Sequence, residues 1–203
     1  MISEMNINMF RMINDLGKED SVLNPIMIFI AEYLVIFLAL AMMIYWFTGN
    51  RKNRVMVGCA MLTFIFAELI GKIAGEIHFN KQPFAELENV NQLIDKAVNN
   101  SFPSNHTMVF FSVCVTFWLF QRGWGFLWLI AAVLVGISRI WVGVHYPADV
   151  LTGAAISIVT ASILYKTVPK FSVTQKIIDV YEKGEDQVFT FMKKKKDEQR
   201  KDM

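Results

Sequence analysis

Long runs of apolar residues alternate with short polar connections along most of this chain. Several of these runs reach the roughly 20 residues that an α-helix needs to cross a bilayer. The runs cover residues 25–47, 55–75, 103–120, 124–141 and 147–165. The pattern therefore predicts an all-α fold, a polytopic membrane helix bundle of about five transmembrane helices.

Two segments that flank the runs carry apolar residues at helical spacing among polar ones. Residues 5–17 predict a short amphipathic helix lying on the membrane, with a plain soluble helix as the alternative. Residues 166–203 mix charges with apolar positions and include Lys193–Lys196. This second pattern predicts an interfacial or solvated helix with a basic patch near anionic lipid.

The positions of basic residues predict how the bundle is oriented, because short cytoplasmic loops are enriched in Lys and Arg. A basic cluster at residues 51–54 follows the first run, Arg122 follows the third run, and the tail is rich in Lys. All three features place the N-terminus outside and the C-terminus in the cytoplasm. The polar stretch 76–101 and the stretch 138–149 then share the outer face.

The composition agrees with a membrane protein and excludes an ordinary soluble domain. Of the 203 residues, 54% are hydrophobic and 19% are charged, and the mean hydropathy is +0.38. The net charge of +2 is small, so the distribution of charge matters more than its total. We expect the membrane bilayer as the environment and no nucleic-acid partner. Cys59 and Cys114 lie inside apolar runs at a spacing unsuited to a metal site, which predicts buried packing residues without a structural disulfide.

The stretch 138–149 brings an Arg, a His and an Asp to the expected lipid boundary, where ionisable residues are expensive and mark functional sites. Pro147 suits the first turn of a helix, which places Asp149 near the third helical position and lets its carboxylate reach back to His145. A carboxylate that accepts one imidazole N–H leaves the other nitrogen free as a nucleophile or base. The alternative is a purely structural helix cap.

Two further groups on the outer face suit an anion. Ser138 and Arg139 end the fourth run, and a forked guanidinium fits phosphate oxygens, although Arg139 could instead snorkel to the interface. A Pro-Ser-Asn-His sequence at residues 103–106 opens the third run. Unpaired N–H groups at a helix start attract anions, Ser104 adds a hydroxyl donor, and His106 adds a titratable group.

These two segments resemble motifs of the type 2 phosphatidic acid phosphatase superfamily. The Ser-Arg-x5-His-x3-Asp pattern that begins at Ser138 matches the family's third motif completely. The Pro-Ser-x-His pattern that begins at Pro103 matches its second motif, with Asn105 where the family commonly has Gly. The chain is therefore identified as a member of this superfamily.

The resemblance implies a role for each matched residue. His145 is expected to be the nucleophile that forms a phosphohistidine, and Asp149 is expected to orient it. Arg139 and Ser104 are expected to hold the phosphate, with Ser138 beside them, and His106 to act as general acid. The resemblance implies neither a metal nor another cofactor.

The family's first motif, Lys-x6-Arg-Pro, is only partly present. Pro83 matches, but Gln82 stands at the Arg position and Gly75 stands at the Lys position. Lys72 lies about one helical turn before that Lys position, and Lys81 is next to Gln82. Each of the two lysines is a candidate for contact with the phosphate, and ordinary loop or helix-end charge is the alternative.

Nearly the whole chain is similar to the bacitracin-resistance type of undecaprenyl diphosphate phosphatase, including the N-terminal stretch and segment 82–86. This implies an enzyme of the bacterial plasma membrane that converts undecaprenyl diphosphate to the monophosphate at the extracytoplasmic face, recycling the cell-wall carrier lipid and giving bacitracin resistance. The expected partner is this polyprenyl diphosphate lipid. Phosphatidic acid or phosphatidylglycerol phosphate is the alternative substrate, and a membrane transport component is the alternative of another class.

Three parts follow along the chain. We expect an N-terminal amphipathic segment over residues 1–24, a transmembrane lipid phosphatase domain over 25–168, and a cytoplasmic amphipathic and basic tail over 169–203. The sequence leaves the oligomeric state open.

Overall fold

The computed structural model describes residues 3–18, 21–48 and 50–201. Residues 1–2, 19–20, 49 and 202–203, which include the ends of the predicted amphipathic segment and tail, lie outside the described residues. The side chains of Lys193–Lys196 also lie outside the description.

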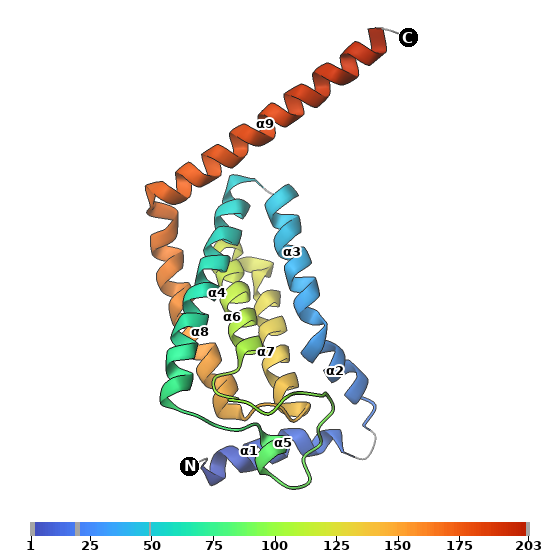
Figure 1. The fold of residues 1–203 in the computed structure, drawn as a ribbon, viewed down its shortest axis with the longest axis vertical. Coiled ribbons are helices and arrows are strands. Elements are labelled where there is room, and N and C mark those ends of the chain that lie inside the picture. Colours follow the sequence, from blue (N-terminus) through green and yellow to red (C-terminus); the bar gives the residue numbers. More distant parts are fainter. Residues whose placement is uncertain (1–2, 19–20, 49, 202–203) are drawn as a thin grey trace.

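Helices make up most of the described chain, and no strand occurs in it, which confirms the predicted all-α bundle (Figure 1). The helices are α1 (Glu4–Asn14), α2 (Asn24–Glu32), α3 (Leu34–Thr48), α4 (Arg51–Ile77), α5 (Pro83–Glu86), α6 (Asn105–Gln121), α7 (Phe126–Trp141), α8 (Pro147–Thr167) and α9 (Ser172–Lys201). Short 3-10 turns are η1 (Asp15–Gly17), η2 (Gly123–Gly125) and η3 (Val168–Lys170).

Each of the five predicted spans corresponds to a helix or a pair of helices. By length and composition, α4, η2 with α7, and α8 with η3 are each long and apolar enough to cross a membrane. Helices α2 and α3 pass the same test together, but the chain bends by 45° where they meet at Tyr33. Helix α6, with 17 residues, falls just short of that length and lies among the others.

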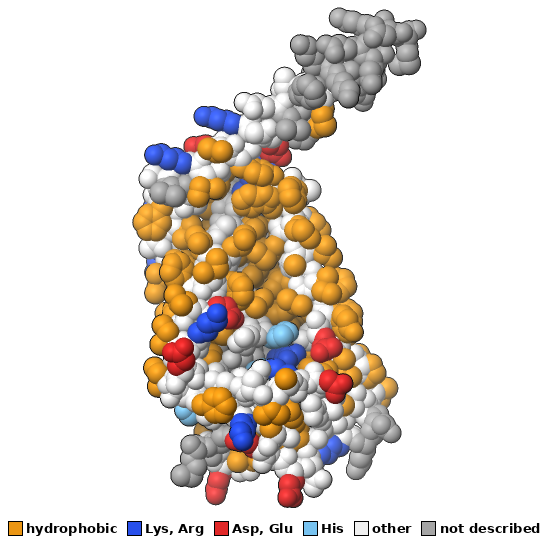
Figure 2. Space-filling view, in the orientation of Figure 1, with side chains coloured by type: hydrophobic (Ala, Val, Ile, Leu, Met, Phe, Trp, Pro, Cys, Tyr) orange, Lys and Arg blue, Asp and Glu red, His pale blue; other side chains and the backbone are white. Residues whose placement is uncertain are grey.

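Helix α6 forms the centre of the bundle because it is apolar on nearly every side. It packs against α4, α7 and α8. The main core cluster joins residues of α3, α4, α6 and α7, with Phe110, Cys114 and Phe117 at its middle. Cys59 and Cys114 are both buried and unbonded, as the sequence predicts. The outer faces of the bundle carry a broad band of exposed apolar side chains, which suits contact with lipid (Figure 2).

Helix α1 lies across one end of the bundle, where the sequence predicts an amphipathic helix (Figure 1). Arg11 donates hydrogen bonds to the carbonyls of Glu88 and Asn89. The Asn14 side chain donates to the carbonyl of Trp141 at 2.7 Å. Helix α1 is thereby fastened both to the long polar loop between α5 and α6 and to the end of α7.

Helix α9 extends from the opposite end of the bundle (Figure 1). Arg51 and Arg54 at the start of α4 hold its first turns through ion pairs with Asp179 at 2.7 Å and Glu185 at 2.6 Å. The polar loop, α1 and the α7–α8 connection therefore lie at one end, and the C-terminal helix lies at the other.

Candidate active site

The connection between α7 and α8 presents His145 at the start of a helix. Pro147 occupies the first turn of α8, and the Asp149 carboxylate accepts the backbone N–H of Tyr146 at 2.9 Å. This confirms the predicted helix start. Gly143 has a φ of 84°, and a Cβ there would lie 2.7 Å from the Asn91 carbonyl oxygen. Glycine is therefore required at the turn that leads to His145.

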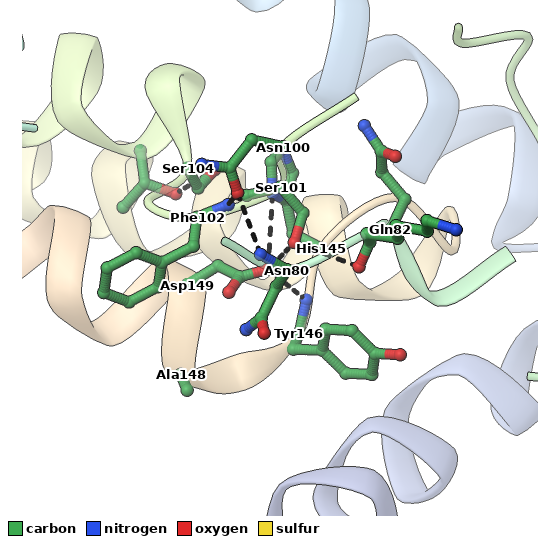
Figure 3. A network of polar contacts seen from close by, with 12 residues as sticks. Asn80, Gln82, Asn100, Ser101, Phe102, Ser104, His145, Tyr146, Ala148 and Asp149 are labelled. Carbon is green, nitrogen blue, oxygen red and sulfur yellow. Dashed lines mark hydrogen bonds and ion pairs between the residues drawn. The ribbon is translucent and has the colours of Figure 1, made fainter. Parts of the chain in front are cut away.

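The imidazole of His145 is oriented by a backbone carbonyl (Figure 3). Its Nδ1 lies 2.9 Å from the carbonyl oxygen of Ser101. Because a carbonyl only accepts, Nδ1 carries the proton and Nε2 keeps its lone pair. The nitrogen with nucleophilic character is therefore Nε2.

The sequence prediction that Asp149 itself accepts the imidazole N–H is wrong in this structure. Asp149 Oδ2 lies 3.7 Å from His145 Nδ1, beyond hydrogen-bond distance. The reason is that Oδ2 already accepts from the Tyr146 N–H and from the Ser101 hydroxyl, the latter at 2.8 Å. Asp149 thus holds the backbone on both sides of His145, including the carbonyl that orients the ring.

Burial keeps His145 neutral. Loss of hydration is the largest cause that lowers its pKa to about 4, the nearby charges of Lys96 and Arg139 act in the same direction, and Asp149 opposes them. The side chain is 3% exposed. At neutral pH the imidazole is therefore unprotonated and available for attack at Nε2.

Lys96 contacts this nucleophilic nitrogen, and sequence reasoning missed it. Its Nζ lies 3.1 Å from His145 Nε2. Burial lowers the pKa of Lys96 to about 8, with Arg139 lowering it and Asp149 raising it. Lys96 belongs to the irregular stretch 76–101, where no periodicity predicts direction. The available signal was a basic residue in a long loop that shares its predicted face with His145.

Arg139 is buried beside the site at the end of α7. It is 2% exposed, and its Nη1 donates to the Ala31 carbonyl at 2.9 Å. Its Nε has no hydrogen-bond partner among the described residues. A buried guanidinium with an unused N–H is suited to an incoming anion. Ser138, by contrast, donates its hydroxyl hydrogen to the Val135 carbonyl of its own helix at 2.7 Å.

The start of α6 forms the second side of the site. Helix α6 begins at Asn105, later than the predicted start at Pro103, because Ser104 has an extended backbone and serves as the N-cap. Ser104 is buried, and its backbone N–H donates to the Asp149 carbonyl at 3.1 Å, which joins the starts of α6 and α8. His106 lies within electrostatic reach of Arg139, Lys96 and His145.

The two lysines proposed from the first-motif region are placed differently. Lys72 is exposed on α4 and lines a cavity of about 450 Å³ with residues such as Gly75 and Asn105. Lys81 is exposed in the loop. Neither is among the charges that act on His145. The structure brings together His145, Asp149, Arg139, Ser104 and His106, and it places Lys72 on a cavity shared with Asn105 of the second-motif segment. A phosphate contact by Lys72 or Lys81 stays a prediction.

Gln82, at the position of the family's Arg, is fully buried and bonded to the loop. Its Oε1 accepts the N–H of Asn99 at 3.0 Å. Its Nε2 donates to the Ala97 carbonyl at 3.4 Å and to the Asn99 side-chain oxygen. Gln82 therefore acts on the loop, and its side chain has no free donor to offer to a ligand.

Comparison with known proteins finds similarity along nearly the whole chain. The pattern of the PAP2 superfamily matches residues 80–172. The bacitracin transport permease protein BcrC of Bacillus licheniformis is 50% identical over 195 residues, 96% of either chain. The undecaprenyl-diphosphatase BcrC of Bacillus subtilis is 35% identical over 80% of this chain and 83% of that protein. The crystal structure of Aquifex aeolicus LpxE superposes with a TM-score of 0.67 and 26% identity, covering 81% of this chain and 96% of that one.

Proposed function

The chain belongs to the PAP2 superfamily, and on this premise we propose that it hydrolyses undecaprenyl diphosphate to undecaprenyl phosphate and phosphate. The observation that carries the proposal is that a neutral His145, with Nε2 as its nucleophilic nitrogen, lies within electrostatic reach of a buried Arg139 with an unbonded N–H. One supplies a nucleophile and the other supplies charge for the phosphoryl group. The substrate assignment draws on the similarity to the undecaprenyl-diphosphatase of Bacillus subtilis.

The reaction begins with in-line attack by His145. Nε2 forms a bond to the terminal phosphorus as the bond from phosphorus to the bridging oxygen breaks, and undecaprenyl phosphate leaves. Water then attacks the phosphohistidine and releases inorganic phosphate and the free imidazole. Asp149 and the Ser101 carbonyl keep the Nδ1 proton in place through both steps.

Positive groups around the phosphorus lower the barrier. Arg139 and the N–H groups at the start of α6 bind the transferring phosphoryl oxygens, with Ser104 at the same helix start. His106 gives a proton to the leaving oxygen where that oxygen needs one. These groups act mainly by position and charge, which is where most catalysis of phosphoryl transfer arises.

An apolar groove along the face of α6 that carries His106 supports a lipid substrate. A cavity of about 400 Å³ lies between α3, α4 and α6, and its lining residues are Val35, Leu38, Ala39, Met42, Met61, Phe64, Ile65, Val109 and Val113. Val109 and Val113 follow His106 by three and seven residues, so they share its face of α6. On the face drawn in Figure 2, a His lies with Lys or Arg side chains at the edge of an apolar surface. We propose that the polyprenyl chain occupies this groove.

The proposed setting is the bacterial plasma membrane with the site on the extracytoplasmic side. The asymmetry of basic residues supports this orientation, since the α3–α4 and α6–α7 connections lie at the end of the bundle opposite the α7–α8 connection (Figure 1). Arg51 and Arg54 begin α4, and Arg122 follows α6. Hydrolysis there recycles the cell-wall carrier lipid. The same reaction removes undecaprenyl diphosphate from the membrane surface, so we expect expression of the protein to raise bacitracin resistance.

The proposal is tested by phosphate release from undecaprenyl diphosphate by the purified full-length protein in detergent. EDTA is present and ATP is absent. We expect turnover by the wild type, none by His145→Ala, and wild-type turnover by His78→Ala. His78 is the matched control because it is exposed and contacts Phe102 rather than the site. Turnover by His145→Ala would overturn the mechanism.

The same assay separates the alternatives. Preference for phosphatidic acid or phosphatidylglycerol phosphate at equal lipid mole fraction would replace the proposed substrate. A transport component would show no phosphate release without ATP or a proton gradient. The His145, Arg139 and Asp149 arrangement favours the enzyme, because transport gives no reason for a neutral, carbonyl-oriented imidazole beside a buried guanidinium.

A further inference from the structure

We propose that Lys96 is a phosphate-binding residue of this site, and that its ammonium, which contacts the His145 nucleophile in this structure, binds the phosphoryl oxygens when substrate binds. The proposal rests on the proposed function only in taking the substrate to be a lipid phosphate or diphosphate. Gln82 is assigned as the residue that positions the loop carrying Lys96.

The contact between Lys96 and His145 is the first step in the argument. Because His145 Nδ1 faces the Ser101 carbonyl, Nε2 is an acceptor, and the Lys96 ammonium donates to it over 3.1 Å. Nε2 is also the atom that must meet phosphorus. An incoming phosphoryl group therefore replaces Nε2 as the partner of Lys96, and its oxygens arrive within reach of the ammonium.

The loop fixes Lys96 from both sides. On its N-terminal side, Ile94 is buried against Trp141 and Val144, and the Leu93 N–H donates to the Val142 carbonyl at 3.2 Å. On its C-terminal side, Gln82 bonds to Ala97 and Asn99. Lys96 lies between two anchors that join the loop to the α7–α8 connection and to the start of α5.

Beyond the hydrogen bonds to Gln82, the loop is also hydrogen-bonded to α4. The Asn100 side chain donates to the Gly75 carbonyl at 2.8 Å and accepts the N–H of Asn80 at 3.1 Å. The Ser101 N–H donates to the Asn80 carbonyl at 2.7 Å. Figure 3 shows these residues gathered around His145 and Asp149. The loop segment from Lys96 to Ser101 thus supplies both the cation on Nε2 and the acceptor on Nδ1.

The charges around Lys96 favour an anionic ligand. Arg139 from α7, Asp149 from α8, and the imidazoles of His145 and His106 face it. Asp149 is the carboxylate of this group, and its Oδ2 is already engaged by Tyr146 and Ser101. Glu32 is a further carboxylate, and it acts on Arg139. The unpartnered N–H of Arg139 and the ammonium of Lys96 nevertheless give a phosphate or diphosphate two positive donors to bind.

This assignment gives the buried Gln82 a role that differs from phosphate binding. Its amide is used on the loop, so positive charge reaches the phosphoryl group from Lys96 rather than from position 82. Lys96 is thus the third cationic or donor arm beside Arg139 and the start of α6.

Inorganic vanadate, an analogue of a transferring phosphoryl group, tests the binding role. Its inhibition constant is measured for the full-length protein with whichever lipid phosphate the wild type hydrolyses, so failure on undecaprenyl diphosphate alone would not affect this test. We expect Lys96→Met to weaken vanadate inhibition about 10-fold or more and to lower kcat/KM about 100-fold. Lys18→Met, at a half-buried lysine that pairs with Asp15 rather than with the site, should change neither.

The pH dependence of kcat/KM in Lys96→Arg separates a phosphate-binding role of Lys96 from a purely structural one. In the wild type, kcat/KM should fall above a pH of about 8 as Lys96 loses its proton. Arg stays charged throughout this range, so Lys96→Arg should retain activity within about 10-fold while its alkaline limb moves to higher pH. Gln82→Ala should lower kcat/KM less than Lys96→Met and add little to it in the double variant.

The proposal is overturned if folded Lys96→Met protein binds vanadate as the wild type does. It is equally overturned if active Lys96→Arg protein keeps the wild-type alkaline limb. Folding is checked by gel filtration and thermal unfolding in detergent. Should Lys96→Met fail to fold, the Lys96→Arg pH profile decides the question alone.

Discussion

Asp149 Oδ2 lies 3.7 Å from His145 Nδ1, whereas it lies 2.8 Å from the Ser101 hydroxyl and 2.9 Å from the Tyr146 N–H. The carboxylate therefore orients the nucleophile through its neighbours. It fixes the segment whose carbonyl accepts the imidazole proton and the helix start that carries the imidazole. The orientation of His145 therefore depends on Asp149 even without a direct hydrogen bond, since the Ser101 hydroxyl and the Tyr146 N–H both donate to Oδ2.

The indirect arrangement predicts how two substitutions combine. Asp149→Asn should lower kcat about 100-fold, because one oxygen can no longer support both neighbours as a charged acceptor. Ser101→Ala should lower it about 10-fold, because the Ser101 carbonyl remains but its hydroxyl anchor is lost. Single-turnover phosphate release measures both effects, with circular dichroism as the check on folding.

The double variant separates the indirect arrangement from a direct one. If Asp149 acts through Ser101, Ser101→Ala should add little to Asp149→Asn. Fully multiplicative losses in the double variant would show that the two residues act independently, and would contradict this account.

The depressed pKa of His145 predicts activity in acid. A neutral imidazole is required for attack, and with a pKa of about 4 the neutral form persists well below the ordinary His value near 6.5. Protonation of Nε2 removes the nucleophile, and it occurs only as the pH falls through about 4. Reaction of His145 with diethyl pyrocarbonate, followed by mass spectrometry against pH, reports Nε2 directly. A midpoint near 6.5 would refute the effect of burial.

The leaving group predicts when His106 is needed. From a diphosphate, a lipid phosphate departs, and phosphate has a second pKa near about 6. From a lipid monophosphate, an alkoxide departs and needs a proton far more. His106→Ala should therefore lower turnover of phosphatidic acid about 100-fold and turnover of undecaprenyl diphosphate less than about 10-fold. Equal losses on both substrates would exclude His106 as the general acid.

The groove predicts a chain-length effect. Val109→Trp should fill the space between α3, α4 and α6, raising KM for the long polyprenyl substrate several-fold while sparing farnesyl diphosphate. Val159→Trp is the matched control, because Val159 is 58% exposed on α8 and lies outside the groove lining. Equal effects of Val109→Trp on long and short chains would place the prenyl chain elsewhere.

Much of the fold and part of the site followed from the sequence. Apolar runs of membrane-spanning length predict the bundle, because a lipid environment allows few other solutions. Pro147 and Asp149 predict a helix start, because capping is a local interaction over three residues. Local signals were less reliable at the start of α6, where Ser104 rather than Pro103 sets the boundary.

Tertiary structure decided which groups meet at the nucleophile. Ser101 and Lys96 contact His145 across 44 and 49 residues of sequence, from a loop whose course has no periodicity to indicate it. That course is set by hydrogen bonds between side chains and distant backbone, such as the one that the Asn99 N–H donates to Gln82 Oε1. The sequence by itself determined a membrane bundle with His145, Arg139 and Asp149 at one end. Only the folded loop determined what orients His145 and which cation lies on it, because those contacts depend on where the loop backbone runs.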